Sequence, residues 1–418
     1  MMTPEAQKKY DEKMARVIAA RTLKEPDRVP ITPSAALFLV FNAGYTVAEV
    51  VYDDTLEKHR KALIKYLNEF DPDNNPGMAN IDAGQGKMLE LQNPKTMRWA
   101  GMPGNIIDEN SLQQYVEFPI LLDDEFDEFN SDRTGWTLRK AIPRTSGLLE
   151  PLGKMNISTS APMVAAEFSK PEVRRMIEDL WKLHDMQVEY NKRVAAILKE
   201  TNEMGYPTLT GGIGGGAPFD QYSNFLRGTL LSLSDLYDRP EEVLKYVEPV
   251  FEASIARIRA AKGKFDGKHV FMALHKGMDG FMSQEHYRDF YWKYLQKVIC
   301  EIVDAGMVPY VFTEGKYNTR LDFLTEVPPG KVIYHFEDVD MAMAKKKLGN
   351  IACITGGFPT SLLDWGTPQQ VIDETKRLID ICAPGGGYIF ETGCGMCNAK
   401  RENVVAMFET VKEYGRYK

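Results

Sequence analysis

The sequence predicts an α/β fold, specifically a (β/α)8 barrel with an elaborated N-terminal region. From about residue 200 onward, short runs rich in β-branched and aromatic residues alternate with long amphipathic segments. This alternation is typical of parallel sheets, in barrels or in doubly wound folds. A length of 418 residues suits a barrel with insertions. The predicted strands are 206–212, 268–275, 307–314, 331–338, 350–357 and 387–393.

Start signals mark several of the helices between these strands. The segments from Asp238 to Glu241 and from Thr367 to Gln370 each resemble a capping box with proline in the first helical turn. Ser283 is a further predicted N-cap. These signals support helices that alternate with the strands.

The first 200 residues are less regular. The segment 29–41 predicts a first barrel strand with its loop, 105–150 an irregular acidic insertion, and 171–203 a long helix. Neither a repeat nor a low-complexity linker divides the chain. We therefore predict one domain over 1–418, in which about 1–200 form an extension with the first strands and about 201–418 hold the site.

Composition limits the environment and the partners. The net charge of −8 argues against a nucleic-acid partner, which favours a basic face. The N-terminus is charged, and no window approaches the ~20 apolar residues of a membrane span. The five cysteines are irregularly spaced, as in a reduced protein. We expect a cytoplasmic enzyme of small ligands or protein partners, and a homodimer is compatible with the sequence.

A glycine cluster at 211–216 follows the first of these strands. It lacks the Lys-Ser/Thr of a P-loop and does not open directly into a helix, as a dinucleotide-binding loop does. We interpret it as a flexible loop rather than a nucleotide site.

Three metal-type side chains fall at predicted strand ends. Alternate residues of a barrel strand point inward, which places Glu314 and His335 on the inner face near the carboxyl ends of their strands. On the last strand the same count groups Tyr388, Phe390 and Thr392 with Cys394. Glu, His and Cys together suit zinc. Taken singly, such a histidine is more often hydrogen-bonded structure and such a cysteine a small buried hydrophobe.

Four segments resemble the uroporphyrinogen decarboxylase/cobalamin-dependent methyltransferase superfamily. They are 215–228, 277–298, 338–380 and 385–417, and the last holds an apolar strand, Gly393-Cys394-Gly395 and Glu402-Asn403 before a final helix. The resemblance covers roughly residues 205–418. It implies a barrel fold and an active site at the carboxyl ends of the strands.

The resemblance has two branches, which differ in their motifs. The decarboxylases carry an arginine-rich N-terminal motif for the substrate carboxylates, whereas the region after Arg28 here has no arginine up to residue 46. The methyltransferases carry His-x-Cys at a strand end, and here that position reads Phe312-Thr313-Glu314. With Cys394 kept and His335 as third ligand, the chain resembles corrinoid-dependent methyltransferase I of anaerobic O-demethylase systems.

That resemblance implies a function and roles for residues. A zinc site of Glu314, His335 and Cys394 would help move a methyl group from a phenyl methyl ether to the cob(I)alamin of a partner corrinoid protein, with Cys397 or Glu337 as further ligand candidates. Candidate walls for the substrate ring are Phe219, Tyr310 and Phe312, although Tyr310 also suits the barrel core. Candidate proton donors or ring-hydroxyl ligands are Asp220, His275 and Asp279, which could equally be structural.

Three alternatives stay open at this stage. One is a methylcobamide:thiol methyltransferase, which would activate a thiol at zinc. Another is a lyase like uroporphyrinogen decarboxylase, and the last is a non-catalytic barrel that only binds a corrinoid or a partner.

Overall fold

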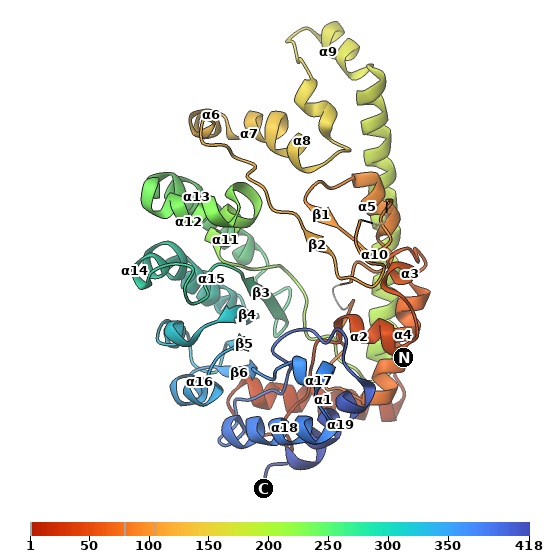
Figure 1. Ribbon diagram of the computed structural model, residues 1–418, viewed down its shortest axis with the longest axis vertical. Helices are drawn as coiled ribbons and strands as arrows, with labels where there is room; N and C mark the ends of the chain where they lie inside the picture. The colour runs from red at the N-terminus through yellow and green to blue at the C-terminus, as the bar shows by residue number, and fades with distance from the viewer. Residues whose placement is uncertain (1, 79–80, 105) are drawn as a thin grey trace.

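The computed structural model describes residues 2–78, 81–104 and 106–418, and a parallel sheet forms its centre (Figure 1). The strands β3 (His269–Leu274), β4 (Val308–Lys316), β5 (Ile333–Asp338) and β6 (Cys353–Gly356) are hydrogen-bonded in that order. Their pairing is parallel throughout, with Phe271 beside Tyr310 and Phe312 beside His335.

Four further extended segments close this sheet into a ring. On one side Thr210 bridges His269 in parallel. On the other side the segment 388–392 bridges β6, and its Phe390 bridges Ile31. The ring closes through backbone hydrogen bonds, from Asp73 to the Ile31 carbonyl at 2.8 Å and from Asn75 to the Pro207 carbonyl at 2.9 Å. The predicted (β/α)8 barrel is thus confirmed, and seven of its segments, including the one at Ile31 within 29–41, lie where the sequence predicts them.

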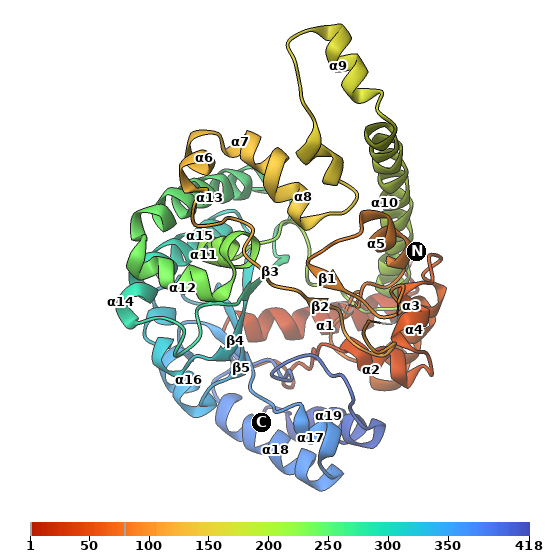
Figure 2. The same ribbon diagram turned by 45° about the horizontal axis from the view of Figure 1, so that its top comes forward.

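Helices follow the strands and surround the ring (Figure 2). In the N-terminal half these are α1 (Pro4–Arg21), α2 (Ala36–Asn42), α3 (Val47–Val51), α4 (Glu57–Phe70), α5 (Gly86–Gln92), α6 (Phe126–Ser131), α7 (Arg133–Trp136), α8 (Ile142–Thr145), α9 (Ala161–Phe168) and α10 (Pro171–Glu203). In the C-terminal half they are α11 (Pro218–Tyr222), α12 (Thr229–Asp238), α13 (Pro240–Ala260), α14 (Gln284–His286), α15 (Lys293–Asp304), α16 (Met341–Leu348), α17 (Ser361–Trp365), α18 (Pro368–Cys382) and α19 (Arg401–Tyr414).

Shorter elements connect these helices. Turns of 3-10 or π-helix occur at η1 (Thr137–Ala141), η2 (Glu150–Lys154), η3 (Ser223–Arg227), η4 (Tyr287–Trp292), η5 (Asn318–Arg320) and η6 (Phe323–Thr325). A small antiparallel pair, β1 (Met97–Arg98) and β2 (Gln114–Tyr115), lies outside the barrel. The insertion predicted over 105–150 contains β2 and the short helices α6 to α8, while residue 105 itself lies outside the described residues.

The predicted helix N-caps were confirmed at two of the three positions. Thr367 forms a complete capping box with Gln370, and the Ser283 hydroxyl accepts from the backbone of His286. The prediction at Asp238 was wrong: this residue ends α12, and α13 starts at Pro240 after Arg239, without a side-chain cap. Proline at the first position stops one helix and starts the next, so Asp238 is not needed as a cap.

The glycine cluster is part of the barrel wall. The backbone N–H of Gly211 donates to the His269 carbonyl at 3.2 Å, and that of Gly215 to the Phe271 carbonyl at 3.4 Å. A Cβ atom on Gly215 would lie 2.8 Å from the Met272 side chain. Glycine is therefore required at this position for the segment to run close beside β3, which the loop interpretation did not foresee.

Helix α1 closes the amino-terminal end of the barrel. Val17 and Ala20 of α1 are fully buried and pack against inward-facing residues of several strands. These strand residues are Leu209, Val308, Ile333, Cys353 and Ile389. They form a small apolar cluster separate from the main core, which lies between the ring and the outer helices.

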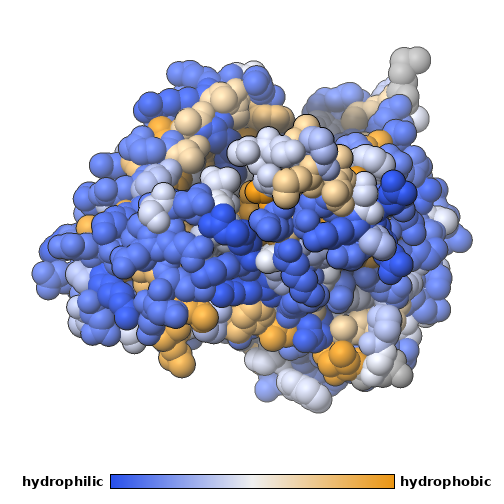
Figure 3. Space-filling view, turned by 90° about the horizontal axis from the view of Figure 1, so that it is seen from above, coloured by the Kyte–Doolittle hydropathy of each residue, from blue (hydrophilic) through white to orange (hydrophobic). Residues whose placement is uncertain are grey.

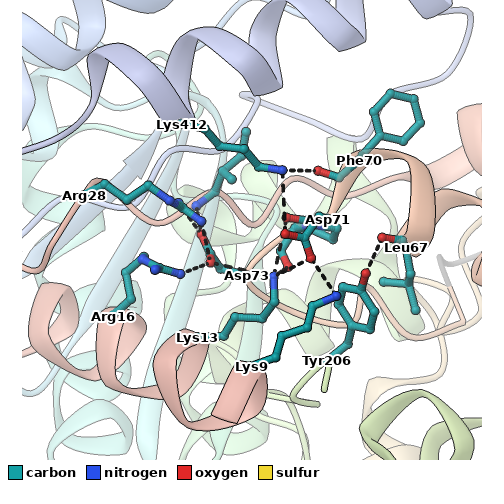
Figure 4. A network of polar contacts seen from close by, with 12 residues as sticks. Lys9, Lys13, Arg16, Arg28, Leu67, Phe70, Asp71, Asp73, Tyr206 and Lys412 are labelled. Atoms are coloured by element: carbon teal, nitrogen blue, oxygen red, sulfur yellow. Dashed lines mark hydrogen bonds and ion pairs between the residues drawn. The ribbon is translucent and has the colours of Figure 1, made fainter. Parts of the chain in front are cut away.

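A buried carboxylate ties α1 to the first two barrel segments (Figure 4). The side chain of Asp73 is fully buried and accepts hydrogen bonds from Arg16 at 2.5 Å, from Arg28 at 2.7 Å and from the backbone N–H of Ile31 at 2.8 Å. Lys13 lies 4.0 Å away and also contacts Asp71 at 2.9 Å. Two guanidinium groups thus compensate the buried charge of Asp73, which meets the condition for burying an ion pair.

Removal of this charge should destabilise the whole barrel. In Asp73→Asn, Arg28 loses its carboxylate partner and Arg16 keeps only Asp27, and we expect unfolding to be easier by about 3–5 kcal/mol. Urea denaturation followed by circular dichroism measures the difference. The matched control is Asp54→Asn, which removes a half-exposed pair with Lys87 and should change stability by less than about 1 kcal/mol. Equal effects of the two variants would contradict the assigned importance of Asp73.

Candidate functional site

Alternate residues of β4 and β5 face the inside of the barrel, as the sequence predicted. Val308 and Tyr310 pack with the inner cluster, whereas Val311 belongs to the main core on the outer side. On β5, Ile333 lies in the inner cluster and Tyr334 in the main core. Counting alternate residues from these positions places Phe312, Glu314 and His335 on the inner face as well.

The face predicted for the last strand was wrong. Tyr388 and Phe390 belong to the main core outside the ring, and Ile389 lies in the inner cluster. The inward residue near the carboxyl end is therefore Glu391, which the sequence reasoning missed. Both faces of a barrel strand are buried, so a run such as Tyr-Ile-Phe carries no apolar–polar alternation that marks its inner side.

A polar network fills the barrel beneath its carboxyl end. The Tyr310 hydroxyl donates to the Glu391 carboxylate and lies 2.7 Å from Nδ1 of His335. Thr32 donates to the other oxygen of Glu391. Nε2 of His335 lies 2.8 Å from the Thr392 carbonyl, so both of its ring nitrogens are engaged. Burial, and then the neighbouring Glu391, raise the pKa of Tyr310 well above its ordinary value, so this residue remains a neutral phenol.

The three predicted zinc ligands lie in separate surroundings. His335 is buried and bonded at both nitrogens, Glu314 faces His275, and the Cys394 thiol lies 3.3 Å from the Thr360 hydroxyl. Within the described ranges, no group of three or more His, Cys, Asp or Glu side chains is spaced to hold a metal ion. The donors as they stand do not fit a zinc ion held by this trio.

The rim of the barrel carries a histidine–glutamate pair. Nε2 of His275 lies 3.5 Å from the carboxylate of Glu314, and both side chains are a little over one third exposed. The Asn224 amide contacts Nδ1 of His275 and so orients the ring. The pair combines a fixed imidazole with a carboxyl group that solvent and small ligands can reach.

The surroundings of Glu314 favour its protonated form. Partial burial, and then repulsion from Glu337, raise the pKa of Glu314 to about 7, while Lys276 opposes the shift. Burial lowers the pKa of His275, so its imidazole is neutral at neutral pH. The pair can therefore hold a proton on the carboxyl group and exchange it near pH 7.

An aromatic wall lies beside this pair. Phe271 of β3 faces inward next to Phe312, with ring centroids 6.2 Å apart and planes inclined by 26°. Phe312 in turn packs on the His335 ring at 4.7 Å. Phe271 is 47% exposed although it lies on the inner face, so solvent reaches this wall. The sequence reasoning missed Phe271, but counting alternate residues along 268–275 would have found it.

The remaining predicted site residues hold loops or fill the core. Asp220 is buried and accepts from the backbone N–H groups of His275 and Lys276, both at 3.0 Å, and from Tyr291 at 2.7 Å. Asp279 accepts from the Thr319 hydroxyl at 2.7 Å. Phe219 is fully buried between tyrosine rings of the main core, away from the inner wall. Asp220 thus acts on the rim indirectly, by fixing the loop that carries His275.

Comparisons with known proteins point to one family. Residues 153–414 match the family model described as Uroporphyrinogen decarboxylase (URO-D). A uroporphyrinogen decarboxylase of Azoarcus sp. (strain BH72) is 27% identical over 142 residues, covering 33% of this chain and 39% of that protein. A uroporphyrinogen decarboxylase of Neisseria gonorrhoeae (strain NCCP11945) is 21% identical over 185 residues. This match covers 43% of this chain and 51% of that protein. The chain thus spans only about two fifths to one half of the length of these relatives.

A solved structure resembles nearly the whole chain. A methyltransferase from Methanosarcina mazei superimposes with a TM-score of 0.59 at 15% identity, covering 96% of this chain and 98% of the other. Identity this low establishes the shared fold alone. Among the described helices, none combines the length and apolarity that a membrane span requires.

The raised pKa of Glu314 can be measured directly. With 13C-labelled glutamate, NMR should show one side-chain carboxyl titrating near pH 7, and Glu314→Gln should remove that signal. In Glu337→Gln the midpoint should move downward, because a repelling negative charge is gone. If no glutamate titrates above pH 6 in the wild-type protein, the described pairing at the rim is wrong.

Proposed function

This chain belongs to the uroporphyrinogen decarboxylase family, and from that premise we propose that it is a methyltransferase acting on methoxylated aromatic compounds. In the proposed reaction, a methyl group moves from a phenyl methyl ether to the cob(I)alamin of a corrinoid protein. One observation carries this proposal: a carboxyl group with a pKa of about 7 stands on the barrel rim beside an accessible aromatic wall. Active sites of such barrels lie at this end of the strands.

The aromatic wall supports a substrate with a planar ring. Phe271 and Phe312 present ring faces on the inner side of the barrel, and offset stacking on such faces favours another aromatic ring. The partly exposed Phe271 gains most from being covered, since apolar area then leaves water. A small aliphatic donor, such as methanol or a methylamine, would leave most of this wall uncovered.

Glu314 is the proposed proton donor. When the ether C–O bond breaks, the electron pair stays on oxygen as a phenolate, and the methyl group bonds to cobalt, which donates two electrons. The protonated carboxyl of Glu314 then transfers its proton to the phenolate oxygen and yields the free phenol. His275, whose Nδ1 contacts Asn224, turns Nε2 toward the resulting carboxylate and can stabilise it.

Two observations favour methyl transfer over decarboxylation. Decarboxylation of a porphyrinogen requires cations that bind several substrate carboxylates, yet Arg16 and Arg28 are bound to Asp73 at the opposite end of the barrel. No arginine follows in the sequence up to residue 46. Thiol methylation is disfavoured as well, because the strand-end position that carries His-x-Cys in the methyltransferases reads Phe312-Thr313-Glu314 here, so one of the thiolates that a thiol-activating zinc prefers is missing.

A coupled assay tests the reaction. Purified enzyme, reduced corrinoid protein and a panel of methoxyarenes should give the absorbance change of methylcobalamin, and Glu314→Gln should lower kcat by roughly 10²–10⁴-fold. Because only the protonated carboxyl donates, wild-type kcat should fall as pH rises through about 7. The Gln variant should lack this dependence.

The controls separate the alternatives. Methanol and trimethylamine serve as donors without a ring and should react poorly. No methyl transfer from any methoxyarene, together with CO2 release from a porphyrinogen, would overturn the proposal in favour of decarboxylation. An unchanged pH profile in Glu314→Gln would remove Glu314 as the proton donor while leaving the reaction itself standing.

Zinc is a separate part of the proposal, because the donors described above do not fit it as they stand. When bound, zinc would supply a Lewis acid for the ether oxygen. Metal analysis of protein purified without chelator decides the question. About one zinc per chain in the wild-type protein, lost in both Glu314→Ala and Cys394→Ala, would support the zinc site. To bind that zinc, His335 would have to give up its hydrogen bond to the Thr392 carbonyl. Zinc-free protein that transfers methyl groups would exclude it.

A further inference from the structure

A small cavity lies at the amino-terminal end of the barrel. It has a volume of about 190 Å³, and its wall is formed by the end of α1 and by the residues that precede β3, β4 and β5. Arg21 is the last residue of α1, while Gly267, Gly306 and Gly330 each stand just before one of the three strands. The rim with Glu314 lies at the other end of the same strands, so a ligand of this cavity is not the methyl donor.

The three glycines keep the cavity open. Their φ angles are +72° at Gly267, +85° at Gly306 and +68° at Gly330, a region that residues with a side chain rarely adopt. A Cβ atom on Gly267 would lie 3.4 Å from Nη2 of Arg21. The chain therefore turns into each strand without placing a side chain in front of the Arg21 guanidinium.

Arg21 lacks the carboxylate that other buried arginines of this protein have. The largely hydrophilic exterior, of which Figure 3 shows one face, leaves most charged groups in water, whereas Arg21 is partly buried. The buried Arg227 pairs with Asp235 at 2.7 Å, but Arg21 donates only to the Gly267 carbonyl at 2.8 Å among the described residues. Burial lowers the pKa of Arg21, and the group that opposes this shift is the Cys353 thiol, not a carboxylate.

Further positive charge gathers around Arg21. Lys268 is also partly buried, and its Nζ donates to the Thr208 carbonyl at 2.6 Å, so it has no carboxylate partner either within the described ranges. Burial, and then the charges of Arg21 and Lys268, lower the pKa of the buried His269 to about 3. Lys331 adds an exposed ammonium group to the wall of the cavity. The potential at this end of the barrel therefore favours an anion.

From these features we infer that the cavity binds a small oxyanion, a carboxylate or phosphate group, that pairs with Arg21. The planar guanidinium offers parallel N–H groups that match two oxygens of such a group. The volume is many times the ~10–15 Å³ that one water needs, yet below the ~300 Å³ at which pockets for drug-sized ligands begin. The inference does not depend on the methyl-transfer reaction.

Other ligand classes suit this cavity less well. A cation would be repelled by Arg21 and Lys331. A neutral apolar molecule would remove water from the Arg21 guanidinium without giving it a hydrogen-bond acceptor, which is costly for a charged group. An oxyanion supplies both the acceptors and the opposite charge.

The test is calorimetric titration of the full chain with sodium phosphate and, separately, with sodium malonate, at an ionic strength held constant with sodium chloride. At least one of these ions should bind saturably, one per chain, with a Kd on the order of 1 mM. The ion that binds more tightly distinguishes phosphate-bearing from carboxylate-bearing ligands. Arg21→Gln should raise the Kd at least about tenfold, because charge-assisted hydrogen bonds are lost. Arg21→Lys, which keeps the charge but not the planar fork, should raise it less.

Two variants with the same loss of charge serve as controls. Arg174→Gln removes an exposed arginine of α10, and Lys276→Gln removes a lysine next to His275 at the opposite end of the barrel. Both should leave the Kd unchanged. Binding that survives Arg21→Gln but not Lys276→Gln would place the anion at the rim and overturn the inference.

The remaining outcomes are equally decisive. No saturable binding of either ion, or an equal response to chloride alone, would overturn the inference. If Arg21→Gln fails to fold, hydrogen exchange of the wild-type protein replaces it. Saturating phosphate or malonate should then slow exchange over 18–23, where α1 ends, and unchanged exchange in this segment with both ions would count against the site.

Discussion

The closure of the barrel depends on one buried carboxylate. Asp73 accepts the backbone N–H of Ile31 and the guanidinium groups of Arg16 and Arg28, while its own N–H donates to the Ile31 carbonyl. The segments at Ile31 and 73–75 are too short for a full strand ladder, so ionic contacts supplement their few backbone bonds. Because α1 carries Arg16, the same carboxylate also holds the helix that closes the amino-terminal end.

The acidic residues along the barrel differ in their neighbouring groups. These neighbours determine whether a carboxyl group stabilises the structure or is available for a reaction. Asp73 has two guanidinium groups, Asp220 has two backbone N–H groups and a tyrosine hydroxyl, and Glu391 has hydroxyl groups from Thr32 and Tyr310. Glu314, by contrast, faces a neutral imidazole and a second carboxylate, Glu337, with only Lys276 opposing. Burial raises the pKa of both Asp220 and Glu314, but Asp220 is buried and bound by its donors, whereas Glu314 is partly exposed and can pass its proton to a ligand, so Glu314 suits proton donation.

The sequence predicted the strands of the C-terminal half because each combines β-branched residues with a following helix. It predicted the inner faces of β4 and β5 because Glu314 and His335, near the strand ends, fix which alternate residues point inward. It failed on the last strand, where Tyr388, Ile389 and Phe390 are all buried. It also failed to identify the barrel segment at 73–75, a polar stretch between Pro72 and Pro76 without a hydrophobic run. Asp220 was predicted as a site residue because a carboxyl group can donate or accept a proton. In the structure it instead fixes the loop at His275 through backbone hydrogen bonds, which a sequence alone does not show.

Exposed apolar side chains lie in several parts of this molecule, and two of these parts differ in what they can bind. Phe271 lies on the inner wall of the barrel, with Phe312 beside it and polar groups of Glu314 and His275 nearby. A ligand there meets aromatic rings on one side and a proton donor on the other, which suits a small molecule with one polar end. On α9 and α10, Met163 and Trp181 are 61% and 67% exposed, and a small ligand there would remain mostly in water.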